Sequence, residues 1–247
     1  MAGHLLEGKV VLVTGGGEGI GAAAARRLAM GGADVAISYL HCAQPATDMV
    51  AELTVLGVHA VAVKADQADP NDVIGMVHDV ARHFGHIDVL VNNAGIVQGD
   101  FSRDLTCVGE QFATNVRGVL TATRETVKYM GEGGRVILVS SIPAACATVA
   151  GLADYPAPKM ALQAHGRAWS RDLEPRGITV NTLQCGFTDT DIPPAAWSDF
   201  GTAMRHGIAL ERFGAFEEAA EVIAFIAGPE SSYITGWTIR VDAAWNA

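Results

Sequence analysis

The sequence has no apolar stretch close to the roughly 20 consecutive residues that a membrane-spanning helix needs. Its start, residues 1–9, lacks the basic and apolar segments that make up a secretory signal. These two absences predict a cytoplasmic protein with no membrane partner.

Cysteine is scarce and scattered. The chain has four cysteines, at positions 42, 107, 146 and 185, and no Cys-x-x-Cys pair among them. A zinc ribbon or a dithiol redox motif requires closely spaced cysteines. We therefore expect no metal site, and we expect reduced thiols that are mostly buried.

Basic residues are also few. The 17 lysines and arginines face 27 acidic residues, which gives a formal net charge of -10, and the basic residues form no cluster. A chain with this charge would be repelled by a polyphosphate backbone. Nucleic acid is therefore excluded as an expected partner.

Hydrophobic residues, in contrast, are abundant. They make up 49% of the 247 residues, and charged residues make up only 18%, a composition that excludes wholesale disorder. The length is sufficient to bury one large core. No proline-rich or serine-rich linker divides the chain, so residues 1–247 are predicted to form a single domain.

Short β-branched segments alternate with longer helical ones along the whole chain. The predicted strands are residues 9–14, 34–39, 59–64, 87–92, 135–140, 178–183 and 238–241. Such alternation is typical of an α/β protein with a parallel sheet. Right-handed crossovers then predict a doubly wound, Rossmann-type sheet of about seven strands with helices on both faces.

One irregular segment, residues 186–214, follows the sixth predicted strand. It carries four large apolar side chains, at Phe187, Trp197, Phe200 and Met204. Ligands of open α/β sheets bind beyond the carboxyl ends of the strands. We expect this segment to be a substrate lid, with an ordinary packed loop as the alternative.

A glycine-rich turn separates the first predicted strand from the first helix. Glycines stand at positions 15, 16, 17, 19 and 21. Residues without a Cβ allow positive φ and let a pyrophosphate approach the amide groups at the helix N-terminus. The position of the turn predicts a dinucleotide site.

The spacing G-x-x-x-G-x-G from Gly15 to Gly21 resembles that of the short-chain dehydrogenase/reductase family. Five further matches follow in the family's order and extend the resemblance over residues 9–242. They are Asp66 after the third strand, the sequence NNAG at residues 92–95, Asn115, Ser141 with the pair Tyr155 and Lys159, and the closing segment from Gly236 to Asp242.

The resemblance implies an NAD(P)(H)-dependent oxidoreductase that interconverts a ketone and a secondary alcohol. It implies a catalytic tetrad of Asn115, Ser141, Tyr155 and Lys159. Tyr155 would be the general acid/base, and Ser141 would donate a hydrogen bond to the substrate oxygen. Lys159, four residues after Tyr155 and on the same helix face, is expected to lower the tyrosine pKa together with the positive nicotinamide of the oxidised cofactor. Asn115 would hold a water that connects Lys159 to solvent.

Cofactor and substrate positions follow from the same resemblance. The expected cofactor-binding residues are Gly15, Gly17, Glu18, Gly19, Ile20, Gly21, Tyr39, Asp66, Gln67, Asn93, Ala94, Gly95, Tyr155, Lys159, Gly186, Thr188 and Thr190. The expected substrate pocket consists of Ile142, Pro143, Phe187, Trp197, Phe200 and Met204.

The choice between NADP and NAD depends on two positions. NAD-selective relatives carry an acidic residue at the end of the second strand, where this chain has Tyr39. NADP-selective relatives often place a basic residue in the glycine turn or after the second strand, where this chain has Glu18 and Leu40-His41. We expect NADP, with NAD as the alternative, because Glu18 can turn toward solvent.

Two departures from the family pattern affect the site. Pro156 and Pro158 follow Tyr155, and proline is tolerated in the first turn of a helix, so that helix is expected to begin near Tyr155. Cys185 stands where the family has a proline before Gly186. We interpret it as a packing residue rather than a nucleophile.

Three functions remain open. The leading one acts on a small to medium, largely apolar carbonyl or alcohol. The runner-up is a 3-oxoacyl-carrier-protein reductase, the group that the chain resembles in overall style. Members that use a carrier protein have basic residues near the entrance, which meet the acidic surface of the carrier. Arg171 fits one such position, whereas Glu132 stands where the other would be expected. A cofactor-sensing protein without turnover is the third. The family also implies a homotetramer, for which Tyr233, Trp237 and Trp245 would suit a buried edge.

Overall fold

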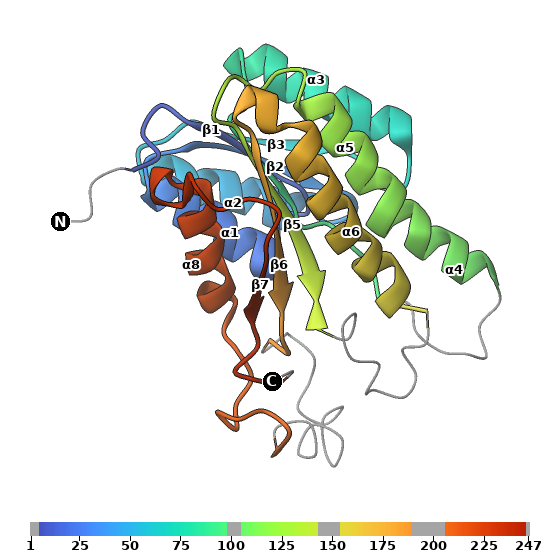
Figure 1. The fold of residues 1–247 in the computed structure, drawn as a ribbon. Helices are drawn as coiled ribbons and strands as arrows, with labels where there is room; N and C mark the ends of the chain where they lie inside the picture. The colour runs from blue at the N-terminus through green and yellow to red at the C-terminus, as the bar shows by residue number, and fades with distance from the viewer. Residues whose placement is uncertain (1–4, 98–104, 143–153, 189–205, 246–247) are drawn as a thin grey trace.

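The computed structural model describes residues 5–97, 105–142, 154–188 and 206–245, and it contains one sheet of seven parallel strands (Figure 1). The strands are β1 (Val10–Val13), β2 (Asp34–Tyr39), β3 (Ala60–Lys64), β4 (Val89–Asn92), β5 (Arg135–Ser141), β6 (Thr179–Cys185) and β7 (Thr238–Val241). Their order across the sheet is β3-β2-β1-β4-β5-β6-β7. The predicted doubly wound Rossmann-type sheet is therefore confirmed.

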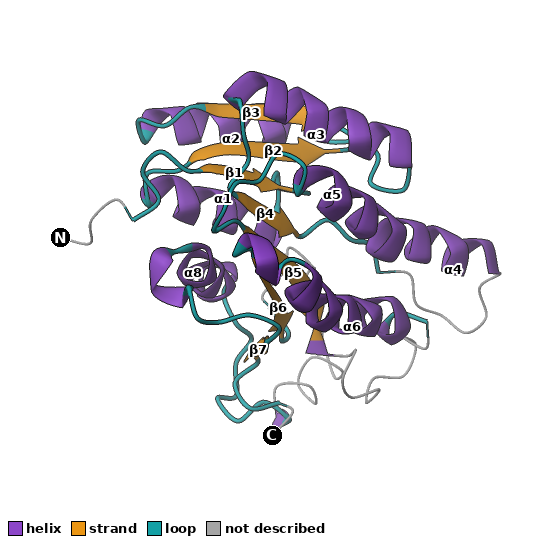
Figure 2. Ribbon diagram, turned by 45° about the horizontal axis from the view of Figure 1, so that its top comes forward, coloured by secondary structure: helices purple, strands orange, loops and turns teal. Residues whose placement is uncertain are grey.

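Helices cover both faces of the sheet, as Figure 2 shows. One face carries α1 (Gly19–Met30), α2 (Ala43–Val55) and α8 (Phe216–Ala227). The opposite face carries α3 (Pro70–Phe84), α5 (Val119–Thr126) and α6 (Pro156–Asp172). The remaining helical segments are α4 (Leu105–Phe112), the π-helix η1 (Ala113–Gly118), and the 3-10 turns η3 (Glu174–Arg176) and η5 (Pro229–Ser231). None of the helices in the described part of the chain is long and apolar enough to cross a membrane.

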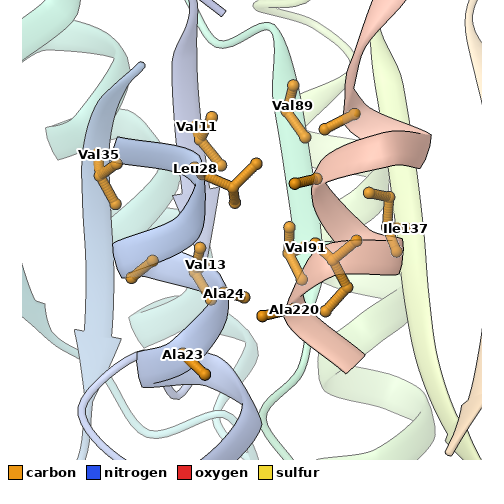
Figure 3. Packing of buried hydrophobic residues seen from close by; sticks show 14 of the residues in the cluster. Val11, Val13, Ala23, Ala24, Leu28, Val35, Val89, Val91, Ile137 and Ala220 are labelled. Atoms are coloured by element: carbon orange, nitrogen blue, oxygen red, sulfur yellow. The ribbon is translucent and has the colours of Figure 1, made fainter. Parts of the chain in front are cut away.

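Burial on both faces explains why the central strands are continuously apolar. All four residues of β1 are at most 3% exposed. On the α1/α8 side, Val11 and Val91 face the region where the two helices meet, and Leu28 packs in the same cluster (Figure 3). Full burial of a leucine side chain contributes about 2 kcal/mol. The small alanine side chains of α1 allow α8 to pack closely against it.

Helix α3 illustrates how local signals fix the boundaries of the elements. Asp69 precedes it, and its side chain accepts a hydrogen bond from the backbone N–H of Asn71 at 2.8 Å. Pro70 occupies the first helical position. Gly85 ends the helix with a φ of +88°, a conformation that glycine adopts without steric cost.

The order of the strands also fixes where a ligand can bind. The chain runs from β1 outward through β2 and β3, and then returns to β4 on the other side of β1. The carboxyl ends of β1 and β4 therefore border the point where the winding reverses, and open α/β sheets bind ligands at such a point. The glycine turn follows β1, and the sequence from Asn93 to Gly95 follows β4, so both of these segments lie at this crevice.

Candidate active site

A cleft of about 640 Å³ lies at this crevice. Its lining includes 11 of the 17 expected cofactor residues, namely Gly15, Glu18, Gly19, Ile20, Tyr39, Asp66, Gln67, Asn93, Ala94, Gly95 and Thr188. It also includes residues outside the expected set, among them Ser38, Leu40, His41, Ile96, Val97 and Phe216. The cleft extends from the β2–α2 connection to the segment that follows β6.

The glycines of the turn differ in the reason for which a residue without a Cβ stands there. Gly15 and Gly19 have φ of +63° and +55°, a region that side chains with a Cβ rarely adopt. A Cβ on Gly21 would lie 2.2 Å from the carbonyl oxygen of Gly15, so that glycine is required for packing. A Cβ on Gly17 would meet nothing closer than 3.9 Å, so Gly17 leaves open space over the turn.

The N-terminus of α1 is available to an anion. Glu18 is the N-cap residue but its side chain makes no capping hydrogen bond, and the first turn of α1 carries no acidic residue. Amide groups at such a helix end point outward and attract negative charge. The turn and helix end therefore fit a pyrophosphate.

Thr14 and Asn93 connect the glycine turn to the end of β4. The backbone N–H groups of Asn93 and Ala94 both donate to Thr14 Oγ1, each at 3.0 Å. Asn93 Nδ2 donates to the carbonyl oxygens of Thr14 and Gly15, also at 3.0 Å. These bonds hold the turn against the neighbouring strand. Sequence reasoning missed Thr14, although its place at the end of the first predicted strand was a usable signal.

Ser38 is a second residue that sequence reasoning missed. Its Oγ accepts a hydrogen bond from Gly15 N, and its carbonyl oxygen accepts one from Gly16 N, each at 3.1 Å. A Cβ on Gly16 would lie 2.5 Å from Ile37 Cγ2. The turn is therefore held from β2 as well as from β4.

The opposite end of the cleft brings together residues expected to act in catalysis. Asn115 lies in the π-helix η1 and is fully buried. Its Oδ1 accepts from Ile96 N and its Nδ2 donates to Ile96 O, both at 2.8 Å. Single π turns inside α-helices occur frequently at functional sites. Here the π turn places the asparagine against the segment that follows β4.

Lys159 meets Asn115 beside Gly95. Lys159 Nζ donates to the carbonyl oxygen of Val139 at 3.1 Å. A Cβ on Gly95 would lie 3.0 Å from Asn115 Oδ1 and 3.1 Å from Lys159 Nζ, so a larger residue there would press on both groups. Burial lowers the pKa of Lys159 to about 8.

Tyr155 is the N-cap residue of α6, as predicted, and is 8% exposed. Its hydroxyl hydrogen-bonds to the side chain of Ser141, the last residue of β5. The predicted lowering of the tyrosine pKa by Lys159 together with the oxidised nicotinamide stays a prediction. Burial raises the pKa of Tyr155, the bond to Ser141 opposes that rise, and the ammonium of Lys159 is not among the causes.

The neighbouring Ser140 has a different role. Its Oγ donates to the carbonyl oxygen of Lys159 at 3.0 Å and is buried. This bond attaches the first turns of α6 to β5, so it positions the helix that carries Tyr155 and Lys159. The two adjacent serines therefore divide into one that supports the helix and one that contacts the tyrosine hydroxyl.

Cys185 is buried at the end of β6, in register with Ser141. Burial raises the pKa of its thiol to about 12, and the nearby Lys159 opposes that rise. The thiolate is the nucleophilic form of cysteine. The structure therefore favours the interpretation of Cys185 as a packing residue.

The expectation of mostly buried thiols is wrong for the other described cysteines. Cys42 is exposed and Cys107 is half-buried, whereas Cys146 lies outside the described residues. Cys42 is exposed because it lies just before α2, in the connection that follows β2. All three described thiols are free, as predicted.

Thiol labelling tests the role of Cys185. We expect iodoacetamide at pH 8 to modify the exposed Cys42 at least about a hundredfold faster than Cys185, because a buried thiol with a raised pKa is seldom ionised. Peptide mapping by mass spectrometry measures both rates in one sample. Equal rates would identify Cys185 as a reactive thiol and contradict its packing role.

Gly186, an expected cofactor residue, lies outside the lining of the cleft. Its backbone N–H donates to the carbonyl oxygen of Val241, the last residue of β7, at 2.8 Å. A Cβ on Gly186 would lie 2.9 Å from Asp242 Cα. This glycine therefore permits the close approach of the chain segments that follow β6 and β7.

The expected substrate pocket is only partly described. Ile142 is fully buried. Phe187 is half-buried, with its ring edge-to-face to that of Trp245 at 5.2 Å. Of the expected lid, residues 186–188 and 206–214 are described. The expected residues that lie outside the described ones are Pro143, Thr190, Trp197, Phe200 and Met204.

Comparison with known proteins agrees with this geometry. A family model described as enoyl-(acyl carrier protein) reductase matches residues 15–246. A short-chain dehydrogenase from Burkholderia cenocepacia, solved in complex with NADP, is 42% identical with a TM-score of 0.94, and the match covers 98% of this chain and 99% of that one. The chain belongs to the short-chain dehydrogenase/reductase family, whose members are NAD(P)-dependent oxidoreductases acting on CH–OH or C=O groups.

Curated relatives with different names match over almost the whole chain. The cyclic-di-GMP-binding biofilm dispersal mediator protein of Escherichia coli is 38% identical, over 97% of this chain and 98% of that protein. Hydroxynaphthalene reductase of Aspergillus fumigatus is 35% identical, over 94% and 90%. The 3-oxoacyl-[acyl-carrier-protein] reductase of Staphylococcus aureus is 35% identical, over 95% and 96%. The chain is similar to each of them to nearly the same degree.

Proposed function

We propose that this protein is an NADPH-dependent reductase that interconverts a ketone and a secondary alcohol of small to medium size and largely apolar character. One observation carries the proposal. Ser141 and Tyr155 are hydrogen-bonded to each other, and Lys159 and Asn115 meet beside Gly95, a residue that lines the cleft. A proton donor, a polarising hydroxyl and a buried amine are groups that suit carbonyl reduction.

The cleft fits a nicotinamide dinucleotide. The open space over Gly17 and the uncapped N-terminus of α1 suit a pyrophosphate. Asp66 Oδ1 accepts from Ala68 N at 2.8 Å, which fixes the carboxylate at the edge of the cleft. When bound, the cofactor supplies the hydride for reduction of the carbonyl. NADPH is proposed because the similar Burkholderia protein was solved with NADP.

The raised pKa of Tyr155 suits the direction of reduction. A phenol that keeps its proton at neutral pH is able to donate it to the oxygen of the substrate as negative charge develops there. Ser141, already hydrogen-bonded to Tyr155, is placed to orient the same oxygen. Lys159, with a pKa of about 8, exchanges protons readily near neutral pH and is therefore suited to restore the proton of Tyr155.

The proposed function is tested by turnover. Purified protein is mixed with NADPH and a set of aliphatic and aromatic ketones, and the loss of absorbance at 340 nm is followed. The proposal expects reduction of at least one apolar ketone. Binding of NADPH without reduction of any ketone, and without oxidation of any alcohol in the presence of NADP, would contradict it.

A role in acyl-chain synthesis is a second candidate, favoured by one feature. Arg167 and Arg171 lie one turn apart on α6 and line a cavity of about 360 Å³. Two exposed guanidinium groups suit an acidic carrier protein. Glu132 is exposed and acidic, and it would repel an acidic partner. A carrier-bound 3-oxoacyl substrate reduced much faster than the same acyl group on a short thiol would favour this candidate.

A binding protein without turnover is the third candidate, since the Escherichia coli relative is named for binding cyclic di-GMP. The intact set of Ser141, Tyr155 and Lys159 favours an enzyme. Cyclic di-GMP is included with NADPH and NADH in a thermal unfolding experiment, because a ligand at about 100 times its dissociation constant stabilises the folded protein by about 2.7 kcal/mol.

Three further expectations stay predictions. They are the single domain over residues 1–247, the lid at 186–214 and the cytoplasmic location.

A homotetramer is proposed as the working assembly. Tyr233 and Trp237 are 102% and 66% exposed beside the edge strand β7, an arrangement that favours burial against another copy. Trp245 instead packs within its own chain, against Phe187. We expect sedimentation velocity at micromolar concentration to give the mass of a tetramer, and Trp237→Glu to give smaller species. A monomer of the unmodified protein would contradict the proposal.

A further inference from the structure

The last three residues of β5 are each held by a side-chain hydrogen bond. Lys159 Nζ donates to the carbonyl oxygen of Val139 at 3.1 Å, and Ser140 Oγ donates to the carbonyl oxygen of Lys159 at 3.0 Å. At Ser141, the carbonyl oxygen accepts a hydrogen bond from Gln184 Nε2 at 3.2 Å. The first two bonds connect the strand to α6, whereas the third connects it to β6.

Gln184 lies on the face of the sheet that α6 covers. Thr182, two residues earlier on β6, lies against that helix, because a Cβ on Gly166 would be 2.8 Å from Thr182 Oγ1. Side chains alternate along a strand, so Gln184 faces the same way. Gln184 is also in register with Ser140, whose hydroxyl bonds to the first turns of α6. The glutamine therefore lies between the sheet and the active-site end of this helix.

Burial of the Gln184 amide is costly without a partner. Gln184 is 1% exposed, and the other side chains on the same face of β6, Val180 and Thr182, are buried as well. Removal of an amide from water costs free energy unless the amide makes a hydrogen bond. An apolar side chain of similar size would fill the same space without that cost. The bond to the Ser141 carbonyl offsets the cost for the amide nitrogen.

The carbonyl group that Gln184 holds belongs to a residue of the candidate active site. The hydroxyl of Ser141 is hydrogen-bonded to Tyr155, and its backbone pairs in register with Cys185. Ser141 is the last residue of β5, so the backbone ladder ends there. A bond to its carbonyl limits rotation of the backbone at this strand end, and thereby limits movement of the hydroxyl.

We propose that Gln184 is a positioning residue for carbonyl reduction, because its amide holds the Ser141 backbone so that the Ser141 hydroxyl stays directed at Tyr155 and at the substrate oxygen. This inference rests on the proposed function, since it concerns the geometry of that same site. Gln184 is not among the residues that line the cofactor cleft. Its effect therefore passes through Ser141 and not through the cofactor.

Gln184→Met tests the proposal, because methionine has a similar length and no hydrogen-bond donor. We expect kcat for an apolar ketone to fall about tenfold, since a small misplacement of a reacting group slows the chemical step. The dissociation constant of NADPH is expected to change less than about twofold, because the cleft is unaltered. Turnover and NADPH binding are measured on the same preparation.

A double-mutant cycle separates positioning through Ser141 from a general structural role. Ser141→Ala is expected to lower kcat about a hundredfold. In that background Gln184→Met has no hydroxyl left to displace, so the double variant is expected to turn over within about twofold of Ser141→Ala alone. A tenfold loss from Gln184→Met in both backgrounds would overturn the proposal, as would an unchanged kcat in the single variant.

Asn181→Leu is the matched control, since Asn181 is a buried amide on the same strand whose Nδ2 donates to a different carbonyl oxygen, that of Ile234, at 2.8 Å. We expect it to lower the free energy of unfolding and to leave kcat unchanged. An equal loss of kcat in Asn181→Leu and Gln184→Met would also overturn the proposal. Gln184→Ser, with a side chain too short to replace the bond, is used in the same cycle if the methionine variant does not fold.

Failure of the unmodified protein to reduce any ketone would contradict the proposed function, and this inference with it. Turnover by the unmodified protein with an unchanged kcat in the Gln184 variants would overturn the inference alone.

Discussion

Replacing Tyr155 by phenylalanine is expected to lower the rate of ketone reduction by at least about a hundredfold, within the roughly 10² to 10⁴ range of general acid catalysis. The variant loses one hydroxyl, which is hydrogen-bonded to Ser141. The ring remains in its buried position, so the fold and the cofactor cleft are expected to be unchanged. Steady-state turnover and the dissociation constant of NADPH are measured on the same preparation.

Tyr129→Phe is the matched control. Tyr129 packs against the core on the α3/α5 face of the sheet, with its ring edge-to-face to that of His78 at 5.9 Å, and it does not line the cleft. Its substitution is expected to leave turnover unchanged. If Tyr155→Phe also retains turnover, the proton must come from another group and the proposed mechanism is wrong.

Replacing Gly21 by alanine is expected to disrupt both folding stability and cofactor binding. The new Cβ would lie 2.2 Å from Gly15 O and 2.5 Å from Asn93 Nδ2, so the turn must shift. Overpacking of this kind costs about 1–3 kcal/mol. We expect a lower free energy of unfolding in urea and at least about a tenfold weaker binding of NADPH.

Gly17→Ala separates the effect on cofactor binding from the effect on folding stability. Its Cβ would meet nothing closer than 3.9 Å, so stability without ligand is expected to be unchanged, whereas NADPH binding is weakened because the open space over the turn is partly filled. Gly75→Ala on α3 is a control for cofactor binding, since a Cβ there has no neighbour within 4 Å, and it is expected to raise the free energy of unfolding by about 1 kcal/mol because alanine is favoured over glycine inside a helix. Equal stability of Gly21→Ala and Gly17→Ala would contradict the packing role of Gly21.

The sequence was sufficient to predict the fold because its signals are local. The predicted ranges of β2 and β7 coincide with the observed strands, and the ends of the other strands differ by at most two residues. Alternation of strands and helices then restricts the topology through the handedness of crossovers. The helix start at Tyr155 could be predicted because proline is tolerated in the first turn of a helix but not in its interior.

The details of the site depend on contacts between segments that are distant in sequence. Thr14 and Ser38 hold the glycine turn through partners on β4 and β2, and neither pairing is visible in a local pattern. The π turn at Asn115 is equally hidden, because it lies within a helical segment without a distinctive composition. These hydrogen bonds and the π turn depend on how distant segments pack together, and not on the local secondary-structure propensity of the residues.

The pKa values of the site residues in the protein without cofactor could not be predicted from the sequence. The i, i+4 spacing places Lys159 and Tyr155 on one helix face, from which a lowered tyrosine pKa was expected. In the structure, the ammonium of Lys159 instead donates to Val139 O, and burial dominates the pKa of both groups. Burial depends on how the surrounding elements pack, and spacing alone does not contain that information.

The most direct test of the central claim uses NADPH that carries deuterium at the reactive carbon of the nicotinamide. A ketone identified in the turnover assay is reduced with each of the two deuterated epimers, and the alcohol is analysed by mass spectrometry. The account predicts one deuterium on the carbinol carbon with one epimer only, and at least about a hundredfold slower formation of this labelled alcohol with Tyr155→Phe. An alcohol without deuterium from both epimers would contradict direct hydride transfer in this site.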